Sequence, residues 1–515
     1  MSSNQIQIDL TPEDYASQAA VSHAVAKALG VGECALEPFR VIRRSIDCRR
    51  RNVMYHCIVE VGTKDFENLK AYKDLKAAKD AKVVVVVGAG PAGLFAGLRA
   101  LQLGLRPVIV ERGKPVEERK KDIVNLVRTK EVNPDSNWCF GEGGAGTYSD
   151  GKLYTRSTKR GDVGEVLRLF VEHGADPDIM VDVHAHIGTD RLPAIIARMR
   201  ETVIEHGGEY HFNTRVTDLL VRDGRVCGVV DAEGNKIEGE AVVLATGHSA
   251  RDIYELFARH GWLLEAKPFA LGVRVEHPQE LINEIQYHGK GFSPLLPPAT
   301  YSLVTQVGKH GVFSFCMCPG GVIVPAATAA GQQVVNGMSN ASRNSGFANS
   351  GIAVTVSPED VGGEEWHLLL DFQKTVEQRM FEAAGGCIDA PSQRLVDFLN
   401  RRPSSRLNKS NYMGHCVSAP LHEVLPSFVV ESLHQGFMDF DRKMKGFVTR
   451  EASLLAVESR TSSPVRIPRD KETLQHPQLQ GLYPCGEGAG YAGGIVSSAL
   501  DGIRCVEMIA STPQR

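Results

Sequence analysis

A run of five valines, Val83–Val87, that leads directly into a glycine-rich turn constrains the fold of this chain more than any other feature. Five consecutive β-branched residues predict a strand that is buried on both faces, as strands of parallel sheets are. The turn opens a segment rich in alanine and leucine that is typical of a helix, and "RPVIVERG" at residues 106–113 predicts a second buried strand. These elements form a βαβ unit, so we expect an α/β fold with a parallel sheet.

The turn matches the pattern G-x-G-x-x-G in the context that a dinucleotide-binding site requires, after a strand and before a helix. The first glycine permits the tight turn, the second lets the backbone approach a pyrophosphate, and the third lets the helix pack on the strand. An acidic residue at the end of the second strand can bind a ribose hydroxyl. A plain βαβ turn is the alternative, but the helix and the acid favour nucleotide binding. The predicted contacts are Gly88, Gly90, Pro91, Ala92, Gly93, Glu111 and Arg112.

A second glycine cluster lies near the C-terminus, where "LYPCGEGAGYAGGI" (residues 482–495) predicts a short strand, a loop and the start of a helix. It resembles the second FAD motif of flavoproteins with two dinucleotide-binding domains. In that family the acidic residue holds a ribityl or phosphate-side hydroxyl, and the helix directs its N-terminus at the flavin pyrimidine, where reduction places negative charge. The family usually has aspartate where this chain has glutamate. The resemblance implies contacts at Gly486, Glu487, Gly493, Gly494 and Ile495.

Two shorter segments carry the same resemblance. "AVVLATG" (residues 241–247) matches the strand and Thr-Gly turn of such flavoproteins, which implies cofactor contacts at Thr246 and Gly247. "NTRV" (residues 213–216) matches the strand whose backbone touches adenine, which places Val216 there. Together the motifs imply FAD as the cofactor. Besides these two glycine clusters, no G-x-G-x-x-G follows a strand, so NADH or NADPH could act only as a transient donor without a separate site.

Longer strings resemble a widespread family of FAD-dependent dehydrogenases, or NAD(FAD)-utilising dehydrogenases, which is related to aminoacetone-oxidase-like and fumarate-reductase-like flavoproteins. The strings are "GEGGAGTYSDGKL", "ATGHSARDIYELF", "KPFALGVRVEHPQ", "VVNGMSNASRNSGFANS" and "ESRTSSPVRI". The resemblance covers nearly the whole chain. It implies the glutathione-reductase-2 type of fold and oxidoreductase chemistry, with hydride transfer at flavin N5, and it brings no assigned substrate.

The glycine-dense loop "GEGGAGTYSDGK" falls where related flavoproteins run a loop beside the isoalloxazine ring. Glycines there let backbone N–H groups approach the ring edge, where Cβ atoms would collide. We expect flavin contacts at Gly144, Ala145, Gly146 and Thr147. Asp150 and Lys152 would then face ribityl, phosphate or substrate, with an ordinary surface lysine as the alternative for Lys152.

The candidates for handling the substrate follow the Thr-Gly turn or lie in polar loops. Arginines in a flavin cleft commonly bind a carboxylate through two hydrogen bonds, although each could equally be a structural salt-bridge partner. Asn344, Ser462 and Ser463 lie beside these candidates, and His415 is a candidate general base or a core histidine. The catalytic candidates are Lys152, His248, Arg251, Arg343 and Arg460.

Metal and disulfide chemistry are not expected. The eleven cysteines include no CxxC pair, which argues against a disulfide reductase. Cys316-Met317-Cys318 is interpreted as a strand with two buried thiols in preference to a redox pair. His184 and His186 would share one face of a strand, but no further ligand completes a metal site.

The motifs divide the chain into three parts. Residues 81–255 and 476–515 would form a discontinuous Rossmann-like FAD-binding domain, with a helical insertion at about 114–184 and a helix capped near Thr189 or Asp190. Residues 256–475 would form a substrate or cap domain. Residues 1–80 predict a small ferredoxin-like α/β module, with a helix capped by Thr11 or Asp14 and two paired strands.

Charge and composition limit the partners. The formal net charge of −3 provides no basic field for nucleic acid or anionic membrane, and the N-terminus has no signal-peptide pattern. We therefore expect a cytoplasmic enzyme that acts on a small-molecule substrate, with no membrane and no nucleic-acid partner. Two alternatives stay open: an RNA-modifying flavoprotein, suggested by the module's arginines, and a non-catalytic flavin redox sensor. The sequence leaves the oligomeric state open.

Overall fold

The valine run forms β4 (Val83–Val87), the central strand of a five-stranded parallel sheet, in a computed structural model that describes residues 5–62, 80–155 and 161–512. The strand order is β22-β10-β4-β5-β6. The other four strands are β5 (Arg106–Val110), β6 (Glu209–His211), β10 (Ala241–Leu244) and β22 (Leu482–Pro484). The predicted α/β fold with a parallel sheet is therefore confirmed, and the C-terminal block supplies an edge strand of the sheet.

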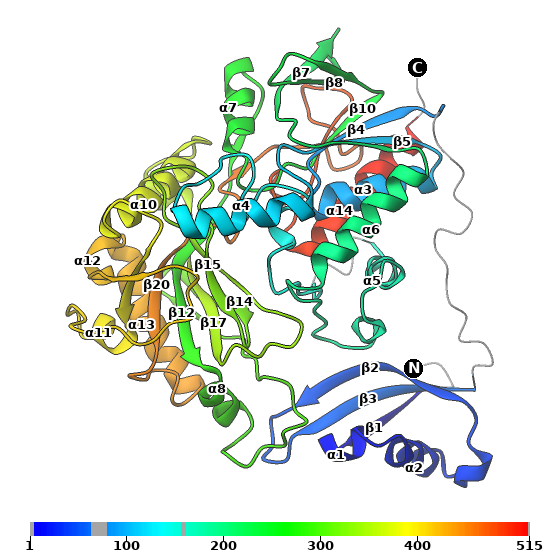
Figure 1. The fold of residues 1–515 in the computed structure, drawn as a ribbon, viewed down its shortest axis with the longest axis vertical. Coiled ribbons are helices and arrows are strands. Elements are labelled where there is room, and N and C mark those ends of the chain that lie inside the picture. Colours follow the sequence, from blue (N-terminus) through cyan, green and yellow to red (C-terminus); the bar gives the residue numbers. More distant parts are fainter. Residues whose placement is uncertain (1–4, 63–79, 156–160, 513–515) are drawn as a thin grey trace.

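The alternation of the valines explains why both faces of this sheet are covered. Val84 and Val86 pack against a helical layer, whereas Val85 and Val87 pack against the opposite layer. The helical layer consists of α3 (Pro91–Gln102), α6 (Leu192–Glu205) and α14 (Ile495–Ser511), which lie side by side in Figure 1. The opposite layer contains the antiparallel sheet of β7 (Val216–Arg222), β8 (Arg225–Asp231) and β9 (Lys236–Glu238), together with α7 (Arg251–His260).

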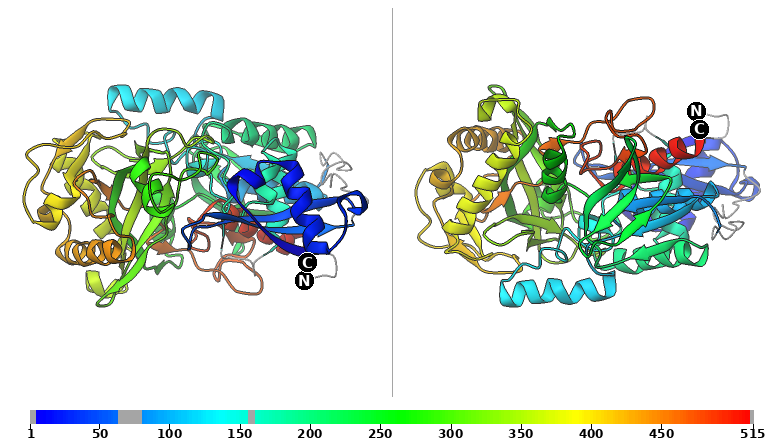
Figure 2. Two further views of the ribbon diagram at one scale, coloured as in Figure 1. Left: turned by 90° about the horizontal axis from the view of Figure 1, so that it is seen from below. Right: turned by 90° about the horizontal axis from the view of Figure 1, so that it is seen from above.

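The predicted helical insertion contains α4 (Val116–Thr129) and α5 (Val163–Glu172), with short 3₁₀ turns η2 (Gly144–Gly146) and η4 (Pro177–Met180). Helix α4 lies on the outside of the molecule along both large domains (Figures 1 and 2). Its Ile123 and Leu126 pack against Val324 and Ala326 of the second domain. The predicted cap of α6 is wrong, because the N-cap is Arg191 and Asp190 instead accepts a hydrogen bond from Ala341 N.

The second domain is built on a seven-stranded sheet of order β13-β14-β17-β12-β20-β18-β19, in which only the β18–β19 pair is parallel among the described strands. Its longest strands are β12 (Phe269–Pro278), β14 (His310–Cys318) and β17 (Phe347–Val356). The other strands of this sheet are β13 (Val304–Val307), β18 (Ala390–Arg394), β19 (Cys416–Ser418) and β20 (Ser453–Glu458). Two separate two-stranded sheets pair β15 (Val322–Pro325) with β16 (Val335–Met338), and β11 (Glu265–Ala266) with β21 (Val465–Arg466).

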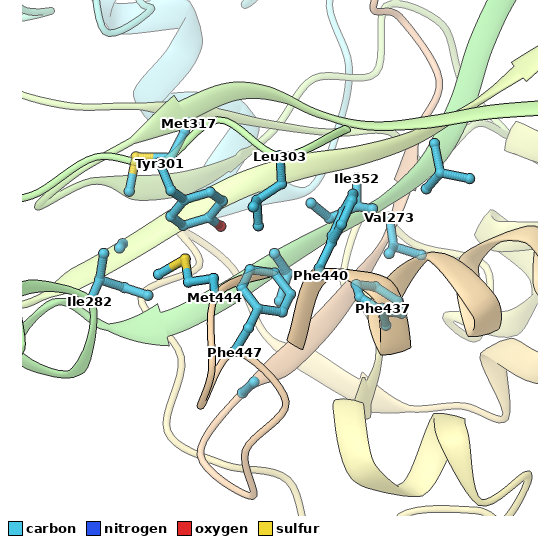
Figure 3. Packing of buried hydrophobic residues seen from close by; sticks show 14 of the residues in the cluster. Val273, Ile282, Tyr301, Leu303, Met317, Ile352, Phe437, Phe440, Met444 and Phe447 are labelled. Carbon is cyan, nitrogen blue, oxygen red and sulfur yellow. The ribbon is translucent and has the colours of Figure 1, made fainter. Parts of the chain in front are cut away.

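Helix α13 (Ser427–Lys443) covers one face of this sheet and gives the domain a core of its own. Figure 3 shows Phe437 and Phe440 of α13 together with Phe447, beside Val273 of β12 and Ile352 of β17. The remaining helices are α8 (Gln279–Gln286), α9 (Pro358–Val361), α10 (Leu368–Ala383), α11 (Leu395–Leu399) and α12 (Leu421–Val424).

The N-terminal module is a three-stranded antiparallel sheet of order β1-β3-β2 with helices on one face. Its elements are β1 (Gln5–Leu10), α1 (Pro12–Tyr15), α2 (Gln18–Leu29), η1 (Glu33–Ala35), β2 (Phe39–Asp47) and β3 (Met54–Val61). The single predicted helix is two helices, since Thr11 caps α1 and Ser17 caps α2. The described part of the module has three strands, one fewer than a complete ferredoxin-like sheet, and residues 63–79 of the predicted module lie outside the described residues.

Arg44 joins the module to the helical insertion of the first domain. Its guanidinium binds Asp182 at 2.5 and 2.7 Å and Asp178 at 3.1 Å, and its backbone pairs with Val181 and Val183.

Within the described ranges, no helix is long and apolar enough to cross a membrane.

Candidate functional site

The carboxyl ends of β4, β5 and β10 open onto a cavity of about 620 Å³. In open parallel sheets this edge is where ligands bind. Most residues predicted to hold the cofactor line the cavity: Gly88, Gly90, Pro91, Ala92, Glu111, Arg112, Gly144, Ala145, Gly146, Val216, Thr246, Gly247, Gly486, Glu487, Gly493, Gly494 and Ile495. Their direct contact with a cofactor stays a prediction.

Two predicted contacts, Gly93 and Thr147, lie behind the cavity wall. A Cβ on Gly93 would come within 1.8 Å of the Gly88 carbonyl oxygen, so this glycine is needed for the close approach of helix and turn. Thr147 is buried, and its hydroxyl donates a hydrogen bond to the carbonyl of Glu142. Both residues therefore shape the glycine segments from behind.

Two helices begin at the cavity, and each has a glycine as its N-cap residue. Among the described residues, no side chain caps α3 at Gly90 or α14 at Gly494. A Cβ on Gly90 would have its nearest neighbour at 3.9 Å, and one on Gly493 would meet no described atom within 4 Å. A side chain at either position would fill cavity space, which is the arrangement expected where a phosphate or a ring approaches the backbone.

Glu111 ties three segments of the cavity wall together. Its Oε2 accepts a hydrogen bond from Ala89 N, and its Oε1 accepts from Gly113 N and Gly141 N, all at 2.9 Å. The carboxylate is 5% exposed and lines the cavity. It therefore fixes the first turn and the glycine-dense loop relative to each other, and its remaining lone pairs face the place predicted for a ribose.

Arg119 holds the glycine-dense loop and was missed by sequence reasoning. It is fully buried and donates to the carbonyls of Asn137, Glu142 and Gly144 at 2.7–2.9 Å. The only signal in the sequence is an arginine in an amphipathic helix, which usually faces solvent. The loop also contacts the first turn directly, because Gly143 N donates to the Ala89 carbonyl at 2.7 Å.

Lys152 lines the cavity beside a buried carboxylate. Its Nζ lies 3.0 Å from Asp150, which also accepts hydrogen bonds from Arg343 (2.6 Å) and Ser339. Burial opposes the charge on Asp150, but Lys152 and Arg343 hold the pKa of its carboxyl well below its usual range. Burial likewise opposes the charge on Lys152, but Cys318 and Asp150 raise its pKa. Lys152 thus stays cationic, and Arg343 acts through Asp150 from outside the cavity wall.

A second charged cluster centres on Glu377, a fully buried residue of α10. It accepts hydrogen bonds from Arg460 at 3.1 Å and from Arg251 at 2.9 Å, and although burial raises its pKa, these arginines lower it to about 2. Arg460 lines the main cavity, whereas Arg251 lines a neighbouring cavity of about 370 Å³. Arg460 also donates to Thr328, so its guanidinium is already well occupied by protein groups.

His248 lines the cavity between this cluster and the second glycine motif. Burial, followed by the charges of Arg460 and Arg251, lowers its pKa to about 4. Its Nδ1 lies 2.9 Å from the Ser249 hydroxyl and its Nε2 3.7 Å from Glu487. At neutral pH the ring is therefore uncharged and can donate or accept one hydrogen bond to a ligand.

Several other expectations differ from the structure. His415 is exposed, so it is neither a core histidine nor a group facing the cavity, and Asn344 is exposed as well. Ser463 is buried and hydrogen-bonds Tyr254. Cys316 was expected to be a buried strand thiol, but it lines the cavity, while Cys318 is buried as expected.

The described residues contain one group with metal-ligand geometry, formed by Cys485, Asp501 and Cys505. Arg469 already binds the Asp501 carboxylate with two hydrogen bonds, at 2.6 and 3.0 Å. The carboxylate therefore has a cationic partner, which gives the group a structural explanation without a metal ion.

Comparisons with known proteins assign the class. Residues 151–289 match the FAD binding domain, residues 268–461 match the C-terminal domain-like region of FAD-dependent proteins, and residues 1–62 match a domain of unknown function, DUF8436. With the cavity and its two uncapped helix N-termini, these matches define an FAD-binding flavoprotein of the oxidoreductase type, and its cofactor is FAD.

The family is shown by a close relative. An uncharacterized protein of Clostridium beijerinckii is 40% identical over 506 residues, which are 94% of this chain and 94% of that protein. The chain belongs to the same family as this clostridial protein.

Solved structures are similar only at a distance. They include the flavin-dependent brominase Bmp2 (13% identity, 83% of this chain and 78% of that chain, TM-score 0.37) and the open conformation of a flavocytochrome c3 fumarate reductase (13%, 83% and 77%, 0.35). The tetracycline destructase Tet(51) is 11% identical over 84% of this chain and 81% of that chain, with a TM-score of 0.33. These similarities are too weak to carry an argument about substrate or reaction.

Proposed function

We propose that the protein is an FAD-dependent dehydrogenase or reductase that acts on a small organic substrate, with hydride transfer at flavin N5. One observation carries the proposal: the cavity is lined by two chemically different sets of residues. The glycine segments and helix N-termini suit the cofactor, whereas Lys152, His248 and Cys316 present side-chain groups that cofactor binding does not need. Bound FAD would supply the two-electron chemistry, and these side chains would choose the substrate and move protons.

Lys152 is the group best suited to bind an anionic substrate. It keeps its charge, it reaches the cavity, and the partner carboxylate of Asp150 is also paired with Arg343. It could hold a substrate carboxylate or stabilise negative charge that develops during hydride transfer. Arg460 is a positioning residue in this proposal, because Glu377 and Thr328 occupy its guanidinium.

Neutral His248 would donate one hydrogen bond to the substrate or accept one from it. Its lowered pKa of about 4 keeps the ring uncharged over the physiological range. A neutral imidazole near Arg460 lets the site bind an anion without adding a proton that titrates near neutral pH.

A small molecule is favoured over RNA as the substrate because several arginines of the N-terminal module are already paired. Arg40 binds Glu60, Arg44 binds Asp182, and Arg49 binds Asp47. A cytoplasmic location and the relationship to aminoacetone-oxidase-like flavoproteins also belong to this proposal. Eleven unpaired cysteines support a reducing compartment.

Anaerobic absorbance spectroscopy tests the proposal. The purified holoprotein is mixed with NADH, NADPH and a panel of small carboxylic acids and amines, and the loss of the oxidised-flavin band is followed. We expect a member of the panel to bleach the flavin, and reoxidation to restore it. Salt-sensitive tRNA binding, with no reduction by any member of the panel, would contradict the proposal and favour the RNA-modifying alternative.

A further inference from the structure

Cys316 and Cys318 lie at an irregularity in β14. Phe315 pairs with Gly351 of β17 and Cys318 pairs with Asn349, so three steps along β14 match two steps along β17. One residue is therefore extra, which is a β-bulge, and Cys316 has a φ of 45° within it. The bulge brings the two cysteines together, since the Cys318 thiol donates a hydrogen bond to the Cys316 carbonyl oxygen at 3.3 Å and its side chain neighbours the Cys316 thiol.

Only one of the two thiols reaches the cavity. Cys316 lines the cavity together with Lys152 and with Glu487 of the second glycine motif. Burial raises the pKa of Glu487, and the charge of Cys316 raises it further. Cys318 lies behind, fully buried, with its Sγ 4.0 Å from Lys152 Nζ.

The neighbouring groups shift the pKa values of the two thiols in opposite directions. The hydrogen bond from Cys318 lowers the pKa of Cys316, burial opposes this, and the cations of Lys152 and Arg274 lower the pKa further. The hydrogen bond to Cys316 and burial raise the pKa of Cys318. The surroundings therefore favour ionisation of Cys316 over ionisation of Cys318, as in dithiols that form and break a disulfide.

The charged groups around the pair come from several elements. Lys152 and Asp150 belong to the glycine-dense loop, and Arg274 of β12 donates to the Cys316 carbonyl at 2.9 Å. Glu458 of β20 pairs with Arg274 at 3.2 Å. Two cations, Lys152 and Arg274, therefore lie close to this pair. Two cysteines that only filled an apolar core would have no such neighbours.

We propose that Cys316 and Cys318 form a redox-active dithiol that exchanges two electrons with FAD bound in the cavity. The proposal rests on FAD binding and is independent of the small substrate. In the oxidising step the Cys316 thiolate and the Cys318 sulfur form an S–S bond. The two electrons and the Cys318 proton pass to oxidised FAD, which becomes the reduced anion. The reverse step cleaves the S–S bond and returns the flavin to its oxidised form, so the site stores four electrons in all.

A reductive titration measures this store. Holoprotein is treated with a mild thiol oxidant, freed of it, and titrated anaerobically with dithionite. The wild type is expected to take up four electrons per flavin, whereas Cys316→Ser and Cys318→Ser take up two. Cys387→Ser is the matched control, since it removes one half-buried thiol of the second domain outside the cavity, and it should still take up four.

A second readout needs no variant and no turnover. Cleavage after Lys309 and Arg343 releases residues 310–343, which contain Cys316 and Cys318 and no other cysteine. After oxidation this peptide should be lighter by two hydrogens and should resist alkylation. After flavin reduction both cysteines should be alkylated. Uptake of two electrons by the wild type, or full alkylation of the peptide from oxidised protein, would overturn the proposal even if a variant failed to fold.

Discussion

Lys152 is the residue on which substrate binding depends most in this account, because it is a cavity-facing cation with a neutralised partner. Lys152→Met removes the charge and keeps an unbranched side chain. We expect kcat/KM for flavin reduction to fall about 100-fold, the effect of losing one charged group that stabilises a transition state. FAD content should stay the same.

The matched control is Lys290→Met, which changes an exposed lysine of the second domain. Stopped-flow measurement of flavin reduction should give wild-type rates for this control. Equal rates for both variants would mean that Lys152 is an ordinary surface lysine, the alternative that the sequence left open.

Glu111 accepts three backbone hydrogen bonds and also lines the cavity, so its substitution should affect both stability and FAD retention. Glu111→Gln leaves one acceptor oxygen for three backbone N–H groups, so we expect loss of charge-assisted hydrogen bonds worth about 1.5–3 kcal/mol each. The variant should melt at a lower temperature and lose FAD during gel filtration. Glu209→Gln, which affects an exposed pair at β6, is the control and should keep both properties.

At the residue scale, the sequence predicted most of the glycines that line the cavity, and the acid at the end of β5. Glycines and a strand-terminal acid have a fixed spacing within one βαβ unit, so local reasoning finds them. Arg119 and Glu377 could not be predicted, because their roles depend on partners far along the chain. Cys316 was misassigned because a regular strand would bury it, and the bulge is decided by pairing with β17.

Helix α3 offers a comparison between two glycines of one motif. Gly90→Ala places a methyl group in open cavity space, whereas Gly93→Ala places it 1.8 Å from a backbone oxygen. We expect Gly90→Ala to fold with little change in melting temperature and to bind FAD at least about tenfold more weakly, by fluorescence titration of the apoprotein.

Gly93→Ala should instead destabilise the apoprotein itself, by roughly 1–3 kcal/mol, since the helix must move away from the turn. Loss of folding in both variants, or full FAD affinity in Gly90→Ala, would contradict the division of this motif into a ligand-facing and a packing glycine.

Strand β12 contains a buried histidine that should make stability depend on pH. His277 is fully buried, donates to the Phe447 carbonyl at 2.8 Å, and burial lowers its pKa to about 4. The unfolded chain takes up this proton near pH 6.5 and the folded chain does not, so stability falls as pH drops below 6.5. The loss amounts to about 2 kcal/mol by pH 5.

Urea unfolding of His277→Gln at pH 7 and pH 5 checks this expectation. The variant should lose less stability than the wild type over that interval. His260→Gln, an exposed histidine of α7, should follow the wild type. An unchanged pH dependence in His277→Gln would contradict the assignment.

The elements that the sequence predicted best are those whose pattern is local and whose faces are both buried. The five valines of β4 were enough to predict a strand that is buried on both faces, and the same argument predicted β5. The start of α6 was wrong because Asp190 is used by a distant loop, and the single N-terminal helix was wrong because Ser17 begins a second one. Capping residues are ambiguous wherever several candidates stand close together.

At the scale of the whole molecule, Arg44 is the main polar link between the N-terminal module and the rest. Arg44→Ala should increase hydrogen exchange in β2 and β3 and leave the flavin spectrum unchanged, because the link lies outside the cavity wall. Arg40→Ala, which breaks an exposed pair within the module, should leave exchange near the wild-type level. Equal protection in all three proteins would show that the module is held by other contacts.

The joining of residues 476–515 to the βαβ unit could be expected from the sequence, because one cofactor needs both glycine motifs. How the second domain completes the cavity could not. Phe315, Cys316 and Asn336 reach it from strands whose approach depends on packing between domains. Of the residues that the second domain adds to the cavity, the sequence predicted Arg460 and missed these three.

The most direct test of the central claim is the flavin content of the purified protein. The protein is denatured, and the released cofactor is identified and counted by chromatography against FAD and FMN standards. The account predicts FAD in a one-to-one ratio with the wild-type chain and a much lower ratio for Gly90→Ala. FMN or no flavin in the wild type, or full FAD in Gly90→Ala, would contradict it.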